Sequence, residues 1–552
     1  MRARTRVLLA ASVALLLGAI ALPAQAAPAK PPQHSPVTCG SQDTPETGIA
    51  GDVTKADQDG SRAAKGYNCG LAVVGHNGFD GELSSSLAWS ASCAYVQGRG
   101  GGVRVVDMSN PTRPAVVKTL PTGGSSENLH AVTTPERALL TAARGKAVVD
   151  VYDVRTCTNP VLLGTVNFIN PSTGVGIPGG PAHNIEFNPD GTKLYGSFPV
   201  QVADLSNLAD SATWTVRDFS CQLASQFHIL HKLVPPTTVN LCEHFTLPPM
   251  MAHEFEFNAD GSRMYIGGQI DPFGDNYIHV VDVTVWPPRL ISSAPGAGHG
   301  IRRATIGGKP YLLHSDETIS PLTALSGLTG GALSRDSAGG LPAIPGLPPL
   351  GTLGQNLLAN GCVPDLLTPN GGAAESHLTS IEDEAHPKTV SELELAINDP
   401  ANCLAQVRSQ VNSTVHYNTV DDPDDTTFAM LSMKNAGLRV WDIRNPAAPK
   451  EAAYFNPGQF TAANGTKSLD IVRMHTVYNK ATGHIWLLSE SGGLWVLELE
   501  PQVRSGLGLA ALPTSYPNGR PARPAAPSTA NPAVAVRSVS LSALTSGYYC
   551  QL

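Results

Sequence analysis

The sequence has few charged residues and lacks several short motifs that mark common enzymes. Charged residues make up 15% of the 552 positions, the formal net charge is −8, and no basic stripe is present. A nucleic-acid partner is therefore not expected. There is no G-x-S-x-G elbow, phosphate-binding loop, H-E-x-x-H pair or EF-hand loop, so hydrolase and nucleotide-binding functions lose support.

Long apolar runs are also lacking, with one exception at the N-terminus. Arg2, Arg4 and Arg6 precede an apolar stretch from Val7 to Leu22, and a small-x-small pattern ends at Ala26. This stretch is short for a membrane span and is followed by a cleavage pattern, so it predicts an export signal cleaved after Ala26. We expect the mature chain to have no membrane span and to be secreted or to lie in the cell envelope.

None of the nine cysteines forms a C-x-x-C pair, so a zinc–thiolate site is not expected. In an oxidising compartment these residues are first of all disulfide candidates. Three local pairings are considered: Cys39 with Cys69, Cys221 with Cys242, and Cys362 with Cys403. The sequence does not settle the connectivity, and the odd count leaves at least one thiol free or paired with another molecule.

What the chain does contain is a repeat of strand, turn and strand, present in seven copies. Two of the clearest are GVRVVDMSNPTRPAVVKTL from Gly102 and GLRVWDIRNPAAPKEAAYF from Gly437. Apolar residues alternate in each copy, and the fuller copies add a Pro-containing turn and a second alternating strand. A second hairpin precedes each copy, as in HNIEFNPDGTKLYGS from His183. Two hairpins per repeat predict an all-β chain folded as a seven-bladed β-propeller of four-stranded antiparallel blades.

The ends of the repeat region predict how the ring closes. The last copy has no clear fourth strand, whereas Cys69 to His76 reads as an isolated one, so this N-terminal strand is predicted to complete the last blade. The predicted organisation is a signal peptide (1–26), an N-terminal extension (27–67), the propeller (68–503, with insertions at about 205–248 and 319–374) and a Pro/Ala-rich tail (504–552). Insertions this long are expected to cover or form a site.

The motifs VVDMSNP and VWDIRNP resemble the LVIVD repeat of secreted bacterial β-propellers. The resemblance extends over roughly Gly70 to Val503. It implies the propeller fold, but it implies no particular activity, because the family has no single established one.

A histidine stands at the start of the first hairpin in six of the seven repeats. These residues are His130, His183, His253, His299, His416 and His475. The first strand of a propeller blade is the innermost, so the six imidazoles are predicted to converge around the central channel near one face. A subset of them is a candidate site for one Cu, Fe or Zn ion. Alternatively, the histidines are structural residues that tie strands together and recur by duplication. The sequence leaves both interpretations open.

Acidic residues near the same face are weaker candidates for acid–base chemistry. Glu254 follows His253 directly, while His314, Asp316, Glu317 and Glu490 lie at the ends of second strands. The Asp that recurs in the third strand is instead predicted to cap the following turn. Its copies are Asp107, Asp153, Asp204, Asp282, Asp383 and Asp442.

Two functions from different classes are consistent with these features. The favoured hypothesis is an extracellular binding or scaffold propeller whose top-face loops hold a protein, glycan or small-molecule partner. The alternative is a metal-dependent enzyme of the oxidoreductase or lyase type, with its ion held by the axial histidines. The choice leans to binding because a fold alone does not imply catalysis.

Overall fold

The computed structural model divides the chain into two compact units, residues 1–32 and 33–552. The first unit lies outside the described residues, as does the predicted signal peptide within it. The described residues are 37–99, 101–122, 129–145, 147–168, 182–197, 199–227, 252–268, 277–296, 298–315, 376–399, 402, 405, 409, 411, 413–461 and 465–512.

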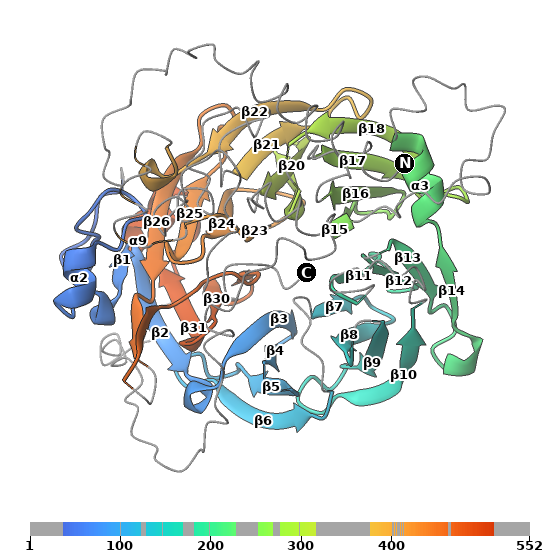
Figure 1. Ribbon diagram of the computed structural model, residues 1–552, viewed down its shortest axis with the longest axis horizontal. Coiled ribbons are helices and arrows are strands. Elements are labelled where there is room, and N and C mark those ends of the chain that lie inside the picture. Colours follow the sequence, from blue (N-terminus) through green and yellow to red (C-terminus); the bar gives the residue numbers. More distant parts are fainter. Residues whose placement is uncertain are drawn as a thin grey trace, which may run out of the picture. The chain divides into compact units, whose positions relative to one another are not determined.

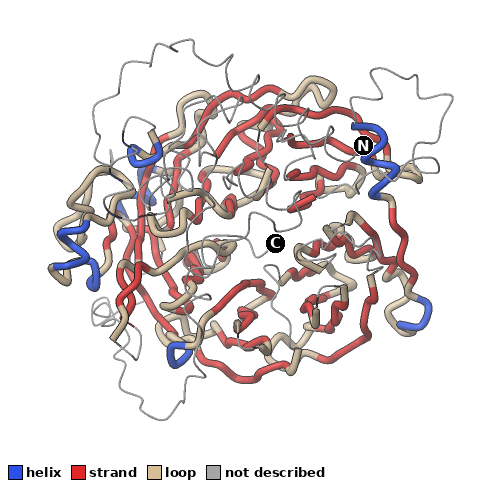
Figure 2. The backbone as a smooth tube through the Cα atoms, viewed as in Figure 1, coloured by secondary structure: helices blue, strands red, loops and turns tan. Residues whose placement is uncertain are grey.

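The described chain consists mainly of strands, with only short helices (Figure 2). Blade one contains β3 (Ser84–Ser90), β4 (Cys93–Gly98), β5 (Val103–Asp107) and β6 (Ala115–Leu120). Blade two contains β7 (His130–Thr133), β8 (Ala138–Ala143), β9 (Val148–Asp153) and β10 (Val161–Asn167). Blade three contains β11 (Ile185–Phe187), β12 (Lys193–Gly196), β13 (Gln201–Asp204) and β14 (Thr215–Asp218).

Four further blades complete the ring. Blade four contains β15 (Ala252–Phe257), β16 (Arg263–Gly268), β17 (Tyr277–Asp282) and β18 (Arg289–Pro295). Blade five contains β19 (Gly300–Ile306), β20 (Lys309–Ser315), β21 (Ser376–Ser380) and β22 (Lys388–Leu393). Blade six contains β23 (Tyr417–Val420), β24 (Phe428–Ser432), β25 (Leu438–Asp442) and β26 (Lys450–Asn456). Blade seven contains β29 (Val477–Asn479), β30 (His484–Ser489), β31 (Gly493–Leu499) and β2 (Leu71–Asn77).

The blades stand around a common axis, with the first strands near the centre and the fourth strands at the rim (Figure 1). Neighbouring first strands contact one another around the axis, among them β3 with β7, β7 with β11 and β11 with β15. All pairing within the blades is antiparallel. The predicted seven-bladed propeller is therefore confirmed.

Ring closure by an N-terminal strand is also confirmed. β2 pairs antiparallel with β31, with Leu71 opposite Leu499 (Figure 1). Just before it, β1 (Tyr67–Cys69) adds a fifth strand to blade six by pairing with β26. Gly70 joins the two strands with φ +69°, and a Cβ there would lie 2.6 Å from the Val503 side chain. The N-terminal segment thus binds the last two blades at once.

The N-terminal extension is anchored by a buried ion pair that the sequence does not predict. The extension includes α2 (Lys55–Asp59) and η1 (Ala63–Lys65). Its residue Glu46 pairs with Arg439 of β25, whose side chain is 0% exposed and also pairs with Glu451, with 3.0 Å from Nη1 to Oε1. Tyr454 lies beneath the same guanidinium, 4.6 Å from ring centroid to Cζ. These contacts fasten the extension to blade six.

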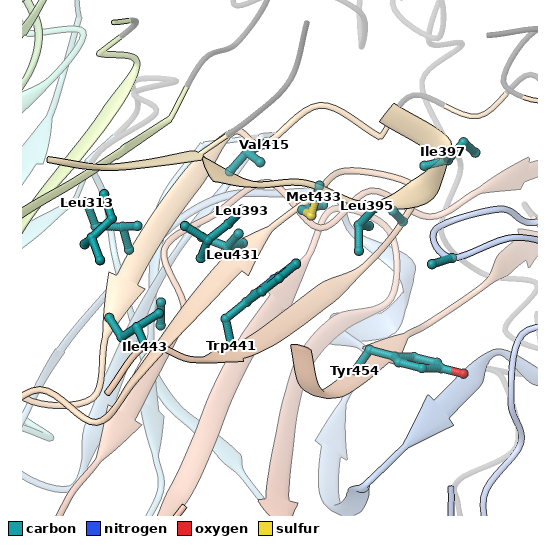
Figure 3. Packing of buried hydrophobic residues seen from close by; sticks show 14 of the residues in the cluster. Leu313, Leu393, Leu395, Ile397, Val415, Leu431, Met433, Trp441, Ile443 and Tyr454 are labelled. Atoms are coloured by element: carbon teal, nitrogen blue, oxygen red, sulfur yellow. The ribbon is translucent and has the colours of Figure 1, made fainter. Parts of the chain in front are cut away.

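Hydrophobic side chains pack between neighbouring blades. Between blades five and six, Leu313 of β20, Leu431 of β24 and Trp441 of β25 belong to one buried cluster (Figure 3). Ala50 and Tyr67 of the N-terminal segment join it. Each fully buried large apolar side chain contributes roughly 1.5–3 kcal/mol. The core is thus distributed around the ring, one cluster between each pair of blades.

The recurring third-strand Asp caps its turn, as predicted. In each of the six copies, a side-chain oxygen of the Asp accepts a hydrogen bond from the backbone N–H two residues later, at 2.9–3.1 Å. In the preceding Asp-Gly turns, Gly191 and Gly261 have φ +68° and +69°, which other residues rarely adopt. These turns all lie at the end of the ring away from the starts of the first strands.

The disulfide pattern is partly as predicted. Cys39 pairs with Cys69, as expected. Cys93 and Cys157, for which no pairing was predicted, link blade one to blade two. Cys221 is also disulfide-bonded. The other predicted partners, Cys242, Cys362 and Cys403, and also Cys550, lie outside the described residues.

The first part of the predicted insertion at 205–248 belongs to blade three. It contains η3 (Ser211–Thr213), β14 and α3 (Ser220–Phe227), and the blade has its fourth strand without the Pro-containing turn that precedes the fourth strand in blades one, two, four, five and six. The rest of this insertion, from 228, lies outside the described residues, as do the insertion at 319–374 and the tail beyond 512.

The remaining described elements are η2 (Phe79–Gly81), η4 (Ala396–Asn398), β27 (Gln459–Thr461), β28 (Lys467–Leu469) and α9 (Pro501–Gly506). Among the described helices, none is both long and apolar enough to cross a membrane.

Candidate functional site at the axis of the ring

The starts of the innermost strands bring the six predicted histidines to one end of the ring. His130 begins β7 and His253 is the second residue of β15, while the others stand one or two residues before β11, β19, β23 and β29. The ends of both long insertions lie at this same end, because β15 begins and β20 ends there. We call this the histidine end of the ring.

Four of the six imidazoles form a continuous row across blades three to six. Its members are His183, His253, His299 and His416, all buried. Ring centroids of His253 and His299 are 3.5 Å apart, and those of His299 and His416 are 4.3 Å apart. The Nε2 atoms of His183 and His253 are 3.4 Å apart. We call this row the histidine arc.

Hydrogen bonds between blades fix the tautomer of three arc histidines. The Nδ1 atoms of His253, His299 and His416 lie 2.8, 2.8 and 2.7 Å from backbone oxygens of the next blade. Those oxygens belong to His299, His416 and Arg473. A carbonyl oxygen only accepts, so each Nδ1 carries the proton and donates it, and the neutral ring has its lone pair on Nε2. These histidines therefore fasten blades together while presenting Nε2 as the basic atom.

The other two histidines contact carboxylates instead of one another. His130 Nε2 lies 2.7 Å from Glu186 Oε1, and the Phe187 N–H donates to His130 Nδ1 at 3.1 Å. His475 Nε2 lies 2.8 Å from Glu254 Oε1. In both residues Nε2 therefore carries the proton, whereas in His253, His299 and His416 Nδ1 carries it. The structure brings four of the six predicted ligands together and places the other two in separate ion pairs.

Glu254 is the centre of a buried network that spans the ring. It extends from blade four and is 0% exposed, and its Oε1 lies 2.8 Å from Nη2 of Arg302 in blade five and 2.8 Å from His475 in blade seven. Its Oε2 accepts the Ile301 N–H at 2.7 Å. Burial opposes the charge, but Arg302, His475 and this N–H together hold the pKa of Glu254 below its usual value. Burial lowers the pKa of His475, so the ring is neutral near pH 7.

Two more carboxylates lie near Arg302. Glu256 Oε2 is 3.8 Å from Arg302 Nη1, and burial together with the nearby Glu186 charge raises the pKa of Glu256 although Arg302 opposes this. Glu186 is 6% exposed, and its Oε2 has no hydrogen-bond partner within the described residues. The three carboxylates Glu186, Glu254 and Glu256 with Arg302 form what we call the axial cluster.

Sequence reasoning missed most of this network. Besides Arg302, Glu186 and Glu256, it missed Tyr417, whose hydroxyl donates to Asn184 Oδ1 at 3.4 Å from the far side of the ring. All five residues lie one or three positions after a repeated histidine. Polar side chains at these positions of an innermost strand are the signal that was available.

The weaker sequence candidates have ordinary structural contacts. His314 Nε2 lies 2.8 Å from Thr379 Oγ1, and Glu490 pairs with Arg99 at 2.9 Å and Arg473 at 3.5 Å. Asp316 and Glu317 lie outside the described residues.

The arc does not form a three-ligand metal site as it stands. Among the described residues, the only three potential ligands with donor atoms within 4.8 Å of one another are Cys39, Asp43 and Cys69. Those two cysteines form a disulfide, so they offer no thiolate. The His183–His253 pair does have a suitable spacing, since two nitrogen ligands about 2.0–2.1 Å from a tetrahedral ion lie about 3.3 Å apart.

Comparisons with known proteins identify one repeat and two propeller structures with low similarity to this chain. A sequence model of the LVIVD repeat matches residues 84–122, which contain blade one. No curated protein matches the chain. The β-propeller domain of Myceliophteria thermophila Cps50 (Swd1) is 10% identical, with a TM-score of 0.42 over 76% of this chain and 96% of that chain. Chaetomium thermophilum Sqt1, crystallised with the N-terminus of ribosomal protein L10, is 10% identical, with a TM-score of 0.37 over 74% of this chain and 82% of that chain. The chain is a seven-bladed β-propeller that carries an LVIVD repeat.

Proposed function

We propose that the protein is an extracellular binding propeller that holds its partner at the histidine end of the ring. The observation that carries this proposal is the contrast between the two ends. At the histidine end, polar and charged side chains from several blades converge and both long insertions join the ring. At the other end, short turns capped by Asp connect the strands. Binding residues concentrate on loops that a rigid scaffold positions.

Two further features support export. The N-terminal segment has the pattern of a signal peptide cleaved after Ala26. The disulfides Cys39–Cys69 and Cys93–Cys157 are of a kind that persists in oxidising compartments.

Photo-cross-linking tests which end binds the partner. A photoreactive amino acid replaces Pro121, which is exposed at the histidine end, or Asp260, which is exposed in the β15–β16 turn at the other end. Each variant is irradiated in the extracellular fraction of its source cells, and adducts are identified by mass spectrometry. We expect adducts from position 121 and none from position 260. Equal labelling, or labelling from position 260 alone, would refute the proposed face.

A metal-dependent enzyme is the second candidate, and the His183–His253 spacing favours it. The Nδ1 hydrogen bonds of the arc are the kind that orient metal-ligating imidazoles. A Cu, Fe or Zn ion would need a third ligand to move closer. The test is mass-spectrometric metal analysis of the mature protein without a His-tag, with a His253→Ala/His299→Ala variant and, as control, His386→Ala, whose side chain is 83% exposed. The metal-dependent enzyme requires about one equivalent of metal in the wild type and in the control, and its loss in the double variant. If the wild type holds no metal after incubation with each ion, this candidate is rejected.

A further inference from the structure

The axial cluster contains three carboxyl groups and one guanidinium group. The carboxyl groups belong to Glu186, Glu254 and Glu256, of which the last two lie 2.8 and 3.8 Å from the guanidinium of Arg302. Their side chains are 8%, 0% and 18% exposed. His475 is neutral near pH 7 because burial lowers its pKa. A buried charge without a counter-charge is costly, and burial together with the nearby Glu186 charge raises the pKa of Glu256, so a cation beside these carboxylates would be stabilised.

The second observation is an oxygen without a partner. Glu186 Oε2 is buried and accepts no hydrogen bond within the described residues, although Oε1 of the same carboxylate contacts His130. Glu186 on β11, Glu256 on β15 and Arg302 on β19 each stand three residues after a repeated histidine, and β15 neighbours both other strands, so Glu186 lies beside the other groups of the cluster. Buried polar atoms are nearly always paired, and one left unpaired points to a group that is not present.

Several side chains in and beside the cluster are partly exposed to solvent. The side chains of Arg302, Glu256, His475 and His130 are 15%, 18%, 12% and 23% exposed. The aromatic ring of Tyr417 lies 4.0 Å from that of His475, between centroids. Tyr417 is 0% exposed, so it supports His475 from behind and does not itself contact a ligand.

The spacing of the carboxylates distinguishes an organic cation from a bare metal ion. Within the described residues, no three carboxylate or imidazole donor atoms of this cluster lie within 4.8 Å of one another. A small hard cation needs several oxygens at 2.3–2.6 Å or less. An ammonium group has three N–H donors and a guanidinium has five, and both can bridge oxygens that stand farther apart.

We infer that the axial cluster binds the ammonium or guanidinium group of an organic cation, which donates hydrogen bonds to Glu186 and Glu256. The source is a free amine or a basic side chain of a protein partner, and the chemistry is the same for both. This inference rests on the proposed binding function and names the ligand class. Glu254 keeps its partners Arg302 and His475 when the ligand binds.

Calorimetric titration of the full mature protein tests this inference. The probe is agmatine, which has an ammonium and a guanidinium group, and butyramide is the neutral comparison. We expect agmatine to bind and butyramide not to bind. Glu186→Gln and Glu256→Gln should each weaken agmatine binding about tenfold or more, because each loses a charge-assisted hydrogen bond. The control Glu82→Gln removes an exposed carboxylate, 65% accessible, and should bind as the wild type does.

Titrations with other probes distinguish the source of the cation and test a metal ion as the ligand. A tetra-arginine peptide that binds more tightly than agmatine identifies a protein side chain as the source, and the reverse identifies a free amine. Agmatine binding that is absent, or equal in the two Gln variants and the wild type, would overturn the inference. Binding of calcium chloride that is lost in the two Gln variants would also overturn the inference. Circular dichroism shows whether each variant is folded. Without ligand, Glu256→Gln should have a higher melting temperature than the wild type, because it removes a desolvated carboxyl group.

The outcome is separate from that of the cross-linking experiment. Adducts at position 121 without agmatine binding would retain the proposed face and reject the cation. Agmatine binding with adducts only at position 260 would retain the cation and reject the face.

Discussion

The histidine arc and the pair His130 and His475 occupy the same position of the repeat but do different chemistry. In three of the four arc histidines, Nδ1 donates to a backbone carbonyl of the next blade. In the pair, Nε2 faces a carboxylate. The repeat places a histidine at the start of a strand, but residues from other blades decide which nitrogen carries the proton. Identical sequence positions are therefore not equivalent sites.

The largest expected effect comes from breaking the network around the pair. Arg302→Leu leaves Glu254 fully buried with only His475 as side-chain partner, and we expect a loss of about 3–5 kcal/mol in the free energy of unfolding. Urea denaturation measures it. The matched control is Arg303→Leu, the next residue, which pairs with the exposed Asp424 and should cost about 1 kcal/mol or less. A loss no larger than that of the control would show that Glu254 does not depend on Arg302.

Replacing His299 and His475 by asparagine or glutamine tests which ring nitrogen donates at each position. The asparagine amide takes approximately the place of Nδ1, and the glutamine amide that of Nε2. We expect His299→Asn to be more stable than His299→Gln by about 1 kcal/mol, because it keeps the donor to the His416 carbonyl.

At His475 the order should reverse, because the donor to Glu254 is Nε2. Urea denaturation of all four variants gives the comparison. The same preference at both positions would show that the two tautomers are not different.

The smallest expected effect is a difference in pH dependence. Burial lowers the pKa of His475, so its contribution to stability is fully present above pH 6.5 and is lost as the pH falls toward the folded pKa. The pKa of Glu254 is also lowered, so its contribution is lost only as the pH falls below 4.5.

Denaturation at several pH values separates the two contributions. His475→Gln should flatten the decline just below pH 6.5 and leave the decline below 4.5. The exposed His386→Gln should retain the wild-type profile; an unchanged profile in His475→Gln would instead assign the decline to other groups.

Local sequence features predicted the ring, and they did so for physical reasons. The Asp-capped turn is made by residues two positions apart, and the alternating strands carry their pattern in a few consecutive residues. The closing strand was visible because Cys69 to His76 had the fourth-strand pattern without a hairpin of its own. The histidines were found because they recur at one position.

The contacts of the candidate site were not predictable in the same way. Glu254 in blade four meets His475 in blade seven across the axis, and Tyr417 in blade six reaches Asn184 in blade three. Such pairs depend on ring geometry and on side chains that do not recur from blade to blade. The disulfide between Cys93 and Cys157 and the fifth strand β1 likewise join segments whose sequences carry no mutual signal.

The pairing of β2 with β31 makes the order of synthesis matter for folding. The strand that completes the last blade precedes every other blade strand in the sequence, and nearly the whole propeller lies between it and its partner. Closing so long a loop costs chain entropy that only the finished blades repay, and such non-local contacts form late. β2 can therefore pair only after β31 has been made, and the ring reaches its full cooperative stability only when both ends of the propeller are present.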